Sequence, residues 1–363
     1  MAGSFPGRLK HFLAGFAQRA ICARISAMRR LLTTLLLSSL MLGAQTKKIV
    51  VMGQNPEIIA DWQSASSQVK LVQVTKETVM QEIADADAFI GSITPAMVRA
   101  GKKLQWTQTI SAGVENVLHR SGGNDLRDSD IILTNNQIVQ GPEIADHAMA
   151  MLLAHSRGLL KAVENRKAEI WRPPGPYEGI ELRGKTAVII GCGGIGQQLG
   201  LRAWAFGMNV IGVDPEDMPF SPFFTSFVKP DQLNEVIPQA DVVFISAPWT
   251  PQSEKMIGPQ QFELMKKGSY FIAVSRGGIY DLNALVKALD SQRLAGAGLD
   301  VFDPEPLPPG HPLWKFNNVI ITPHIAGRSD MDRGRMLGIV KSNIQRFAEG
   351  KPLLNVVDKH RGW

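Results

Sequence analysis

The sequence predicts an α/β protein with two doubly wound parallel-sheet domains. From residue 47 onward, short β-branched segments alternate with stretches in which apolar residues recur at helical spacing. Some of the short segments, such as 187–190, are almost continuously apolar, which suits strands buried on both faces of a parallel sheet. The length of 363 residues is enough for two domains, at about 100–200 residues each.

The expected elements form two series. Strands of the first series are expected at 48–52, 69–74, 88–90, 104–110 and 131–133. A helical stretch then runs from Glu143 to about Glu169, and the proline-rich segment 172–176 marks a loop after it. Strands of the second series are expected at 186–190, 209–213, 241–246, 270–274, 296–300 and 319–322. Strands that alternate with helices in this way favour parallel sheets.

Composition excludes several classes of protein. With 44% hydrophobic and 20% charged residues, the chain is neither a disordered polymer nor a coiled coil or collagen-like repeat. Its two cysteines, Cys22 and Cys192, are too few for a disulfide scaffold or a four-thiolate zinc module, and no metal site is expected. No apolar run reaches ~18 residues, so no stable membrane span is expected.

The net charge of +6 resides in the first 46 residues. This leader carries six basic residues and no acidic residue, which leaves 33 basic against 33 acidic residues in the body. Because the body is neutral, it offers no basic groove for phosphates, and a nucleic-acid partner is not expected.

The leader, 1–46, has the residue order of a secretory signal. Met28 and two arginines precede the apolar run 31–42, and the segment 43–45, which begins with two small residues, follows it. This order favours export, with Met28 as a possible true start, over a cytoplasmic location. A basic extension and an organellar transit peptide are the alternatives. The two arginines loosely fit a twin-arginine signal for a folded protein, and they equally fit the general secretory route.

Residues 191–196, with the sequence GCGGIG, match a G-x-G-x-x-G motif. The motif directly follows the expected strand 186–190 and opens the helical stretch 197–206, which is the context of a dinucleotide fingerprint. There the glycines allow a tight turn and close approach of a pyrophosphate, which the helix N-terminus favours. Cys192 is expected to be a small packing residue. The alternative is a glycine turn in a nucleotide-free α/β domain.

The next expected strand ends in Asp214, 18 residues after Gly196. At this position an acidic side chain accepts hydrogen bonds from the adenosine ribose hydroxyls. Glu216 and Asp217 follow, and no Arg or Lys stands nearby in the sequence to receive a 2′-phosphate. These residues favour NAD over NADP as the cofactor.

Arg276, Glu305 and His324 fall at or just beyond the carboxyl ends of consecutive expected strands. That edge of an open α/β sheet is where ligands bind. An Arg can hold a carboxylate bidentately and polarise a carbonyl, a His can donate a proton as hydride arrives, and a carboxylate can orient that His. Together they suit the reduction of a 2-keto acid. Taken singly, Arg276 also suits a surface ion pair, Glu305 a charge on a loop, and His324 a cap at the end of a strand.

At these residues the sequence resembles the D-isomer-specific 2-hydroxyacid dehydrogenase family, over essentially all of residues 47–363. The motifs that carry the resemblance are the glycine fingerprint, SRG at 275–277, GAGLDVFDPEPLP at 296–308, HPLW at 311–314 and TPHIAG at 322–327. Two positions depart from the family pattern. Trp249 stands where a Leu is usual, which is expected to narrow the nicotinamide side of the cleft, and Ala273 stands where an Asn is common.

The resemblance implies a NAD-dependent enzyme that interconverts a D-2-hydroxy acid and a 2-keto acid. It assigns Arg276 to substrate binding and carbonyl polarisation, His324 to acid/base catalysis, and Glu305 to the role of its partner. Backbone amides of the loop that carries Ala112, Gly113 and Val114 are expected to hold the substrate carboxylate. The residues expected to contact NAD, from the glycine motif and the resemblance together, are Gly191, Gly193, Gly194, Ile195, Gly196, Asp214, Ala247, Pro248, Ser253, Val274, Ser275, Arg276 and Asp300.

The resemblance also implies the domain arrangement. A flavodoxin-like substrate domain is expected at 47–135 and 328–363, with a Rossmann NAD-binding domain, 136–327, inserted into it. The active site is expected in the cleft between them, which closes by a hinge motion. A homodimer through the NAD-binding domain and a small 2-keto or 2-hydroxy acid as the partner are expected. The alternative from another class is a dinucleotide-sensing binding protein of the same fold with little or no turnover.

Overall fold

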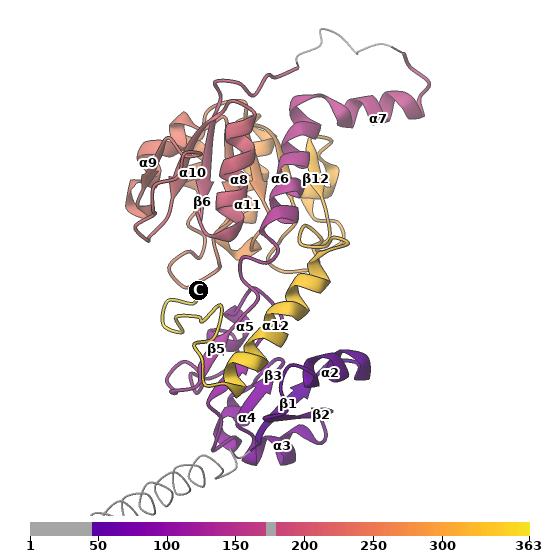
Figure 1. The fold of residues 1–363 in the computed structure, drawn as a ribbon. Helices are drawn as coiled ribbons and strands as arrows, with labels where there is room; N and C mark the ends of the chain where they lie inside the picture. Colours follow the sequence, from indigo (N-terminus) through magenta and orange to yellow (C-terminus); the bar gives the residue numbers. More distant parts are fainter. Residues whose placement is uncertain (1–45, 172–178) are drawn as a thin grey trace, which may run out of the picture. The chain divides into compact units, whose positions relative to one another are not determined.

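The computed structural model describes residues 46–171 and 179–363 (Figure 1). The expected leader lies outside the described residues apart from Thr46, and so does the proline-rich loop 172–176. The described residues form two α/β domains, each built around one sheet. Among these residues no helix has the length and hydropathy needed to cross a membrane, and no group of three or more His, Cys, Asp or Glu side chains is placed to hold a metal ion.

The first domain is built on a five-stranded sheet with the order β2-β1-β3-β4-β5. Its strands are β1 (Lys47–Met52), β2 (Val69–Val74), β3 (Ala88–Ile90), β4 (Trp106–Gln108) and β5 (Ile132–Thr134). The pairs β1–β3, β3–β4 and β4–β5 are parallel. This strand order is that of a flavodoxin-like sheet and confirms the predicted fold.

Helices cover both faces of the first sheet. Successive strand residues point to opposite sides and therefore pack against different helices. On one face Val50 packs with residues of three short helices, namely α3 (Val79–Glu82), α4 (Pro95–Ala100) and α5 (Glu115–Leu118). On the other face Ile49 and Val51 pack with residues of α2 (Pro56–Gln63) and α12 (Asp332–Ala348). The helix α12, drawn in yellow in Figure 1, follows the second domain in the chain and completes the core of the first.

The second domain is built on a seven-stranded sheet with the order β12-β11-β10-β9-β6-β7-β8, and all neighbouring strands are parallel. Its strands are β6 (Thr186–Ile190), β7 (Asn209–Val213), β8 (Ser226–Val228), β9 (Val242–Ile245), β10 (Ser269–Ala273), β11 (Leu294–Leu299) and β12 (Val319–Ile321). The order reverses between β6 and β9. In a Rossmann domain the dinucleotide binds at the carboxyl ends of the strands beside such a switch point.

Helices also cover both faces of the second sheet. Ala187 and Ile189 pack with residues of α6 (Gly141–Ser156) and α8 (Gly194–Ala205). Val188 and Ile190 face the opposite core, which contains residues of α9 (Leu233–Val236), α10 (Pro259–Leu264) and α11 (Leu282–Asp290). Short 3₁₀ helices complete the described elements at Ile83–Asp85, Pro230–Gln232, Ile237–Gln239, Gly277–Ile279 and Pro312–Lys315.

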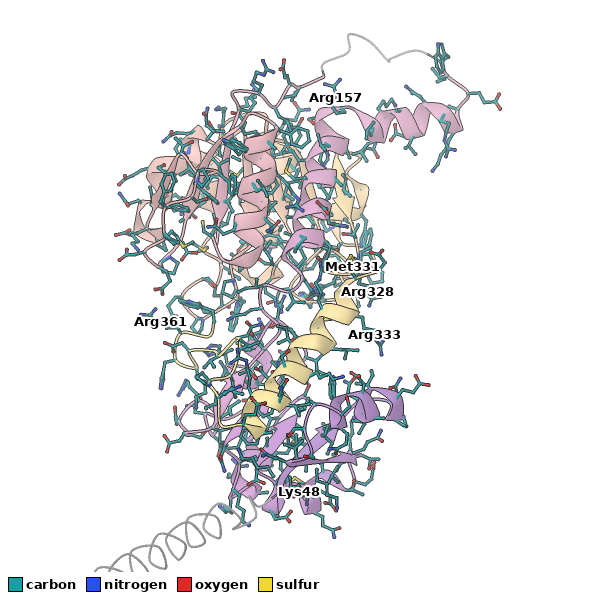
Figure 2. All side chains as sticks on the ribbon, in the orientation of Figure 1. Lys48, Arg157, Arg328, Met331, Arg333 and Arg361 are labelled. Atoms are coloured by element: carbon teal, nitrogen blue, oxygen red, sulfur yellow. The ribbon has the colours of Figure 1, made fainter. Side chains whose placement is uncertain are left out.

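Eleven strands lie within two residues of their predicted bounds. The strand β8 is absent from the prediction, because it has only three residues, none of them buried. The single helix expected at 143–169 is wrong. Gly158 adopts a left-handed conformation with φ 65° and separates α6 from a second helix, α7 (Leu159–Lys167). No residue of α7 is buried, and its side chains project from the ribbon in Figure 2.

Candidate active site

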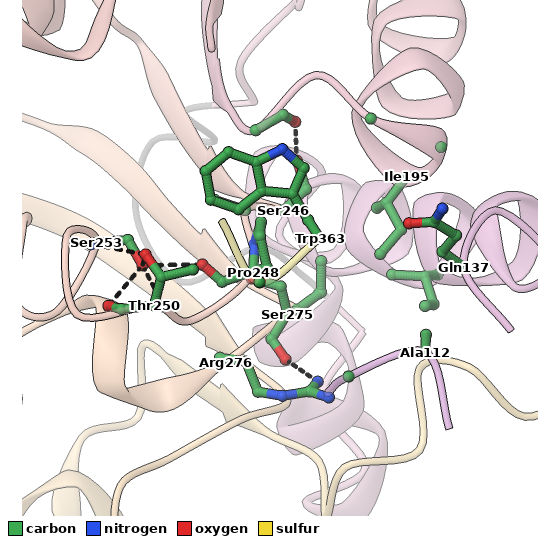
Figure 3. Close-up of a pocket in the computed structure, with 18 of the residues that line it drawn as sticks. Ala112, Gln137, Ile195, Ser246, Pro248, Thr250, Ser253, Ser275, Arg276 and Trp363 are labelled. Carbon is green, nitrogen blue, oxygen red and sulfur yellow. Dashed lines mark hydrogen bonds between the residues drawn. The ribbon is translucent and has the colours of Figure 1, made fainter. Parts of the chain in front are cut away.

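A cavity of about 810 Å³ lies at the carboxyl ends of the strands and is lined by residues of both domains (Figure 3). Most of the predicted site residues line it, namely Ala112, Gly113, Val114, Gly191, Gly193, Gly194, Ile195, Asp214, Ala247, Pro248, Ser253, Val274, Ser275, Arg276, Asp300 and His324. Glu305 and Gly196 do not line it. The structure therefore gathers the glycine motif and two of the three expected catalytic residues around one cavity.

Two glycines of the motif are required by close backbone approach. Gly191 has φ 90°, and a Cβ at this position would lie 2.4 Å from Cα of Ala247. A Cβ at Gly196 would lie 2.1 Å from the carbonyl oxygen of Gly191. Gly193, in contrast, has no atom within 4 Å of the position of a Cβ, and α8 begins at the next residue. The first residues of α8 line the cavity, so the free backbone amides of a helix N-terminus lie at the place that a pyrophosphate site requires.

Asp214, which directly follows β7, holds the glycine loop 191–196 by a hydrogen bond. One carboxylate oxygen accepts a hydrogen bond from the amide of Cys192 at 2.7 Å, and the other accepts from the amide of Glu216 at 2.9 Å. Cys192 is fully buried, and burial, with a smaller contribution from Asp214, raises the pKa of its thiol. A Cβ at Gly212 would lie 2.7 Å from its Sγ, so Cys192 fills the space below the loop as a packing residue.

The acidic turn after β7, residues 214–217, lies close to basic residues from other parts of the chain. Lys229 Nζ lies 2.7 Å from Asp217 and donates to the carbonyl of Pro215 at 3.0 Å. Lys229 lowers the pKa of Asp217 through this contact. Arg361 forms an ion pair with Glu216. The prediction that no Arg or Lys lies near this turn is therefore wrong. The two basic residues are separated from the turn in the sequence, and the fold brings them to it.

His324 and Glu305 form the predicted contact, with His324 Nδ1 2.8 Å from Glu305 Oε2. The other oxygen of Glu305 accepts from the amide of Phe302 at 2.8 Å, so the carboxylate is held on two sides. His324 has φ 54°, in the left-handed region, where His occurs more often than most residues. Its amide donates to the carbonyl of Asp300 at 2.9 Å, which holds this conformation.

Asp300 organises the loop that carries His324. Its carboxylate, 1% exposed, accepts from Thr322 Oγ1 at 2.5 Å and from the amides of Ile325 and Ala326 at 2.9 Å each. His147 Nε2 lies 3.0 Å from the same Thr322 hydroxyl. Because the hydroxyl proton goes to Asp300, His147 is the donor to Thr322. The sequence predicts no role for His147, since a lone histidine on a helix carries no signal of its contacts.

Arg276 lies against the loop expected to hold the substrate carboxylate. Its Nε donates to Glu115 at 2.7 Å and its Nη1 donates to the carbonyl of Ser275 at 2.7 Å. The remaining nitrogen, Nη2, lies so close to Gly113 that a Cβ there would come within 1.8 Å of it. Glu115, from the first domain, is absent from the predicted site, although it directly follows the predicted residues 112–114.

Trp249 does not narrow the cavity as expected, because it is not among the residues that line it. Its ring lies under the guanidinium of Arg120, 4.4 Å from Arg120 Cζ to the ring centroid. A Cβ at Gly278 would lie 2.6 Å from the indole, so the ring fills a space that this glycine leaves.

A second cavity, of about 600 Å³, lies at the carboxyl ends of the first-domain strands. It shares Ile110 and Ser111 with the larger cavity, and Ser92, Gln73 and Lys76 contribute polar groups. The two cavities are therefore neighbours on either side of the segment 110–111.

Comparisons with known proteins agree with this geometry. A family model described as D-isomer specific 2-hydroxyacid dehydrogenase, NAD binding domain, matches residues 149–326. The D-3-phosphoglycerate dehydrogenase of Methanocaldococcus jannaschii is 34% identical over 290 residues, which cover 78% of this chain and 54% of that protein. The glyoxylate reductase of Korarchaeum cryptofilum is 31% identical over 298 residues, which cover 78% of this chain and 86% of that protein.

A solved structure extends the likeness to three dimensions. An acyclic imino acid reductase, solved in complex with NADPH and D-Arg, superposes with a TM-score of 0.72 at 25% identity. The match covers 85% of this chain and 99% of that chain. The chain spans about half the length of the first curated relative and nearly all of this structure.

Proposed function

Because this chain belongs to the D-isomer specific 2-hydroxyacid dehydrogenase family, we propose that it is a NAD-dependent enzyme that interconverts a D-2-hydroxy acid and a 2-keto acid. The observation that carries the proposal is the position of His324. It lines the same cavity as the glycine loop and Arg276, while its Nδ1 contacts Glu305 outside the cavity lining. An acid/base group, a cation and a dinucleotide cradle thus meet in one place.

The residues present fit a dinucleotide. The start of α8 lines the cavity, and Asp214 directly follows β7, where the ribose of the adenosine half would lie. When bound, NADH supplies the hydride that adds to the carbonyl carbon of the keto acid. Residues 193–195 and Asp214 would hold this cofactor. The side chains of the protein would bind the substrate and transfer the proton.

Arg276 and His324 would act on the substrate. The amides of the loop at Gly113 and the nearby Nη2 of Arg276 suit a carboxylate, and the guanidinium also polarises the 2-keto oxygen. Imidazolium at His324 donates the proton on Nε2 to that oxygen as the carbon–oxygen π bond is lost, which gives the hydroxyl. Glu305 accepts a hydrogen bond from Nδ1 and orients the ring. In the oxidation the proton returns to Nε2.

A panel of 2-keto acids assayed with NADH tests this proposal, with loss of nicotinamide absorbance as the readout. The His324→Asn variant is the matched control, because it retains a residue that tolerates the left-handed conformation and lacks the acid. Turnover of at least one acid by the wild type, and its loss in the variant, supports the enzyme. Tight NADH binding without turnover across the panel supports the dinucleotide-sensing alternative.

We propose NAD rather than NADP as the preferred cofactor. Asp214 supports this choice, since its carboxylate favours free ribose hydroxyls over a 2′-phosphate. Lys229 and Arg361 oppose it in part, because they offset the charges of Asp217 and Glu216. The imino acid reductase named above was solved with NADPH, so the shared fold alone does not decide between the two cofactors.

We propose the domain boundaries 47–135 with 328–363 and 136–327, supported by the packing of α12 on the first sheet. We also propose a homodimer through the second domain. Its support is the exposed apolar side chains on and after α7, with Leu159 50% and Trp171 100% exposed. Analytical ultracentrifugation of the wild type and of Val163→Asp tests the dimer. A wild type that sediments as a monomer at micromolar concentration refutes it.

We propose that residues 1–46 direct export, on the sequence pattern alone. Fractionation of cells that express the full chain, with sequencing of the mature N-terminus, tests this. A cytoplasmic protein with an intact N-terminus refutes export, and export that survives replacement of both Arg29 and Arg30 by Lys refutes only the twin-arginine route.

A further inference from the structure

The segment 358–363, here called the strap, follows α12 and is fixed to the first domain. Lys359 Nζ donates to three backbone carbonyls, those of Leu126 at 3.1 Å, Ile131 at 2.9 Å and Ser129. Burial lowers the pKa of Lys359, and Asp130 and Asp128 oppose this effect. The strap also forms a turn, because the amide of Asp358 donates to a main-chain oxygen of Trp363 at 2.9 Å. The contacts of Lys359 and Asp358 therefore fix the conformation of the strap.

The other end of the strap is fixed to the second domain. Arg361, labelled in Figure 2, pairs with Glu216, two residues beyond Asp214. A Cβ at Gly362 would lie 3.4 Å from Cγ2 of Thr250, so the strap also approaches the loop after β9. Both contacts are at the carboxyl ends of strands beside the switch point between β6 and β9.

These contacts bring Trp363 to the cavity. Trp363 lines it together with Asp214, Glu216 and Pro248, and Figure 3 shows the indole among the lining side chains. The half of a dinucleotide next to Asp214 is the adenosine half, because the ribose hydroxyls of adenosine bind at the end of the second strand of the Rossmann unit. The nicotinamide half would lie toward Arg276 and His324. The Arg361–Glu216 pair thus places Trp363 on the adenosine side.

We propose that Trp363 is a cofactor-binding residue that forms a wall for the adenosine half of the dinucleotide, and that the Arg361–Glu216 ion pair positions it. Aromatic rings suit this role, since every base has a π face on which an indole can stack. The proposal rests on dinucleotide binding as proposed above. The predicted cofactor-binding residues all belong to the second domain. Trp363 would add a contact from the first domain to the affinity for the cofactor.

Fragment binding to the full-length protein, measured by calorimetry, tests the proposal. ADP-ribose reports the adenosine half and nicotinamide mononucleotide reports the other half. In Trp363→Ala we expect ADP-ribose and NADH to bind about tenfold more weakly, with nicotinamide mononucleotide unchanged. Trp363→Phe retains an aromatic face and should recover most of the loss. Trp204→Ala, which removes a half-exposed indole on α8 away from the cavity lining, is the control and should bind like the wild type.

The positioning role of Arg361 has its own test. Arg361→Gln should weaken ADP-ribose binding in the wild-type background and have little further effect in Trp363→Ala, because it acts through the indole. Wild-type affinity for ADP-ribose in Trp363→Ala overturns the proposal, as does an equal loss of nicotinamide mononucleotide affinity. A protein that binds ADP-ribose through Trp363 but reduces no keto acid keeps this inference and refutes only the proposed reaction. A wild type that binds neither NADH nor ADP-ribose refutes both.

Discussion

His324 Nδ1 lies 2.8 Å from Glu305 Oε2, and only the histidine of this pair lines the cavity. Because Nδ1 contacts Glu305, Nε2 is the ring nitrogen available for proton transfer with the substrate. Replacement of His324 by Ala should lower kcat by ~10²–10⁴-fold, the usual contribution of a general acid or base. Reduction requires the protonated ring and oxidation the neutral ring, so wild-type reduction should slow as pH rises and oxidation should slow as pH falls. Steady-state rates in both directions across pH measure this.

A comparison of two variants separates chemistry from backbone strain at His324. Asn tolerates the left-handed conformation at φ 54° better than Ala, so the two variants should lose similar activity while Asn retains more stability. Unaltered turnover in either variant would contradict the acid/base role.

The ion pair between Arg276 and Glu115 joins the two domains across the substrate loop, with 2.7 Å between Nε and Oε1. Glu115→Ala should raise the KM for the keto acid by about tenfold, because the guanidinium loses a charge-assisted hydrogen bond that orients it. Glu115→Gln keeps an acceptor and should lie between Ala and the wild type. Asp125→Ala, which breaks a surface pair with Arg99, is the control and should leave KM unchanged. Equal KM values in all four proteins would remove Glu115 from the site.

Thr322 connects His147 to Asp300 and lies two residues before His324. Thr322→Val conserves the shape of the side chain and removes the hydroxyl, so Asp300 and His147 each lose a partner. We expect destabilisation of about 1–3 kcal/mol by urea unfolding, together with a lower kcat. His147→Gln keeps a donor near the position of Nε2 and should retain more activity than His147→Leu. If Gln and Leu behave alike, the hydrogen bond to Thr322 does not position the loop.

Asp214 should select NADH over NADPH by at least a factor of ten in kcat/KM, or ~1.4 kcal/mol. A 2′-phosphate beside this carboxylate meets like charge and lacks the ribose hydroxyl. Asp214→Ala should narrow the difference between the cofactors. Equal efficiency of the wild type with both cofactors would show that Lys229 and Arg361 outweigh the acidic turn.

His155 should make stability depend on pH. Burial lowers its pKa below the ordinary value of 6.5, although a hydrogen bond to the carbonyl of Ala297 opposes this effect. The folded state therefore resists protonation, so stability is full above pH 6.5 and falls as pH decreases through that value. His155→Gln removes the titrating group and should lose less stability between pH 7.5 and pH 5 than the wild type. Urea unfolding at about these two pH values measures the difference, and equal losses would contradict the assignment.

The strand pattern was predictable because both sheets are parallel and buried on both faces. The apolar run 187–190, for example, lies inside β6, whose predicted and observed bounds are the same. The break at Gly158 was less predictable, because a glycine inside an apolar pattern can also continue a helix. The residues expected to form the site are mostly gathered around one cavity, since carboxyl ends of parallel strands share one edge of the sheet.

The contacts absent from the prediction join residues far apart in the chain. Arg276 is 161 positions from Glu115, and Arg361 is 145 positions from Glu216. Local sequence patterns cannot predict these two ion pairs, because the packing of two domains brings the partners together. Glu115 alone had a detectable signal, as an acid directly beside the predicted substrate loop.

The packing of α12 on the first sheet has a consequence for biosynthesis. α12 supplies Val340, Ile344 and Phe347 to the core that contains Ile49 and Val51. A ribosome completes every strand of the second domain, the last of which ends at Ile321, before it begins this helix. The nascent first sheet therefore presents an apolar face that α2 covers only in part while the second domain is made. Chaperones that bind emerging chains should meet that face, and the first domain to be synthesised is the last to close.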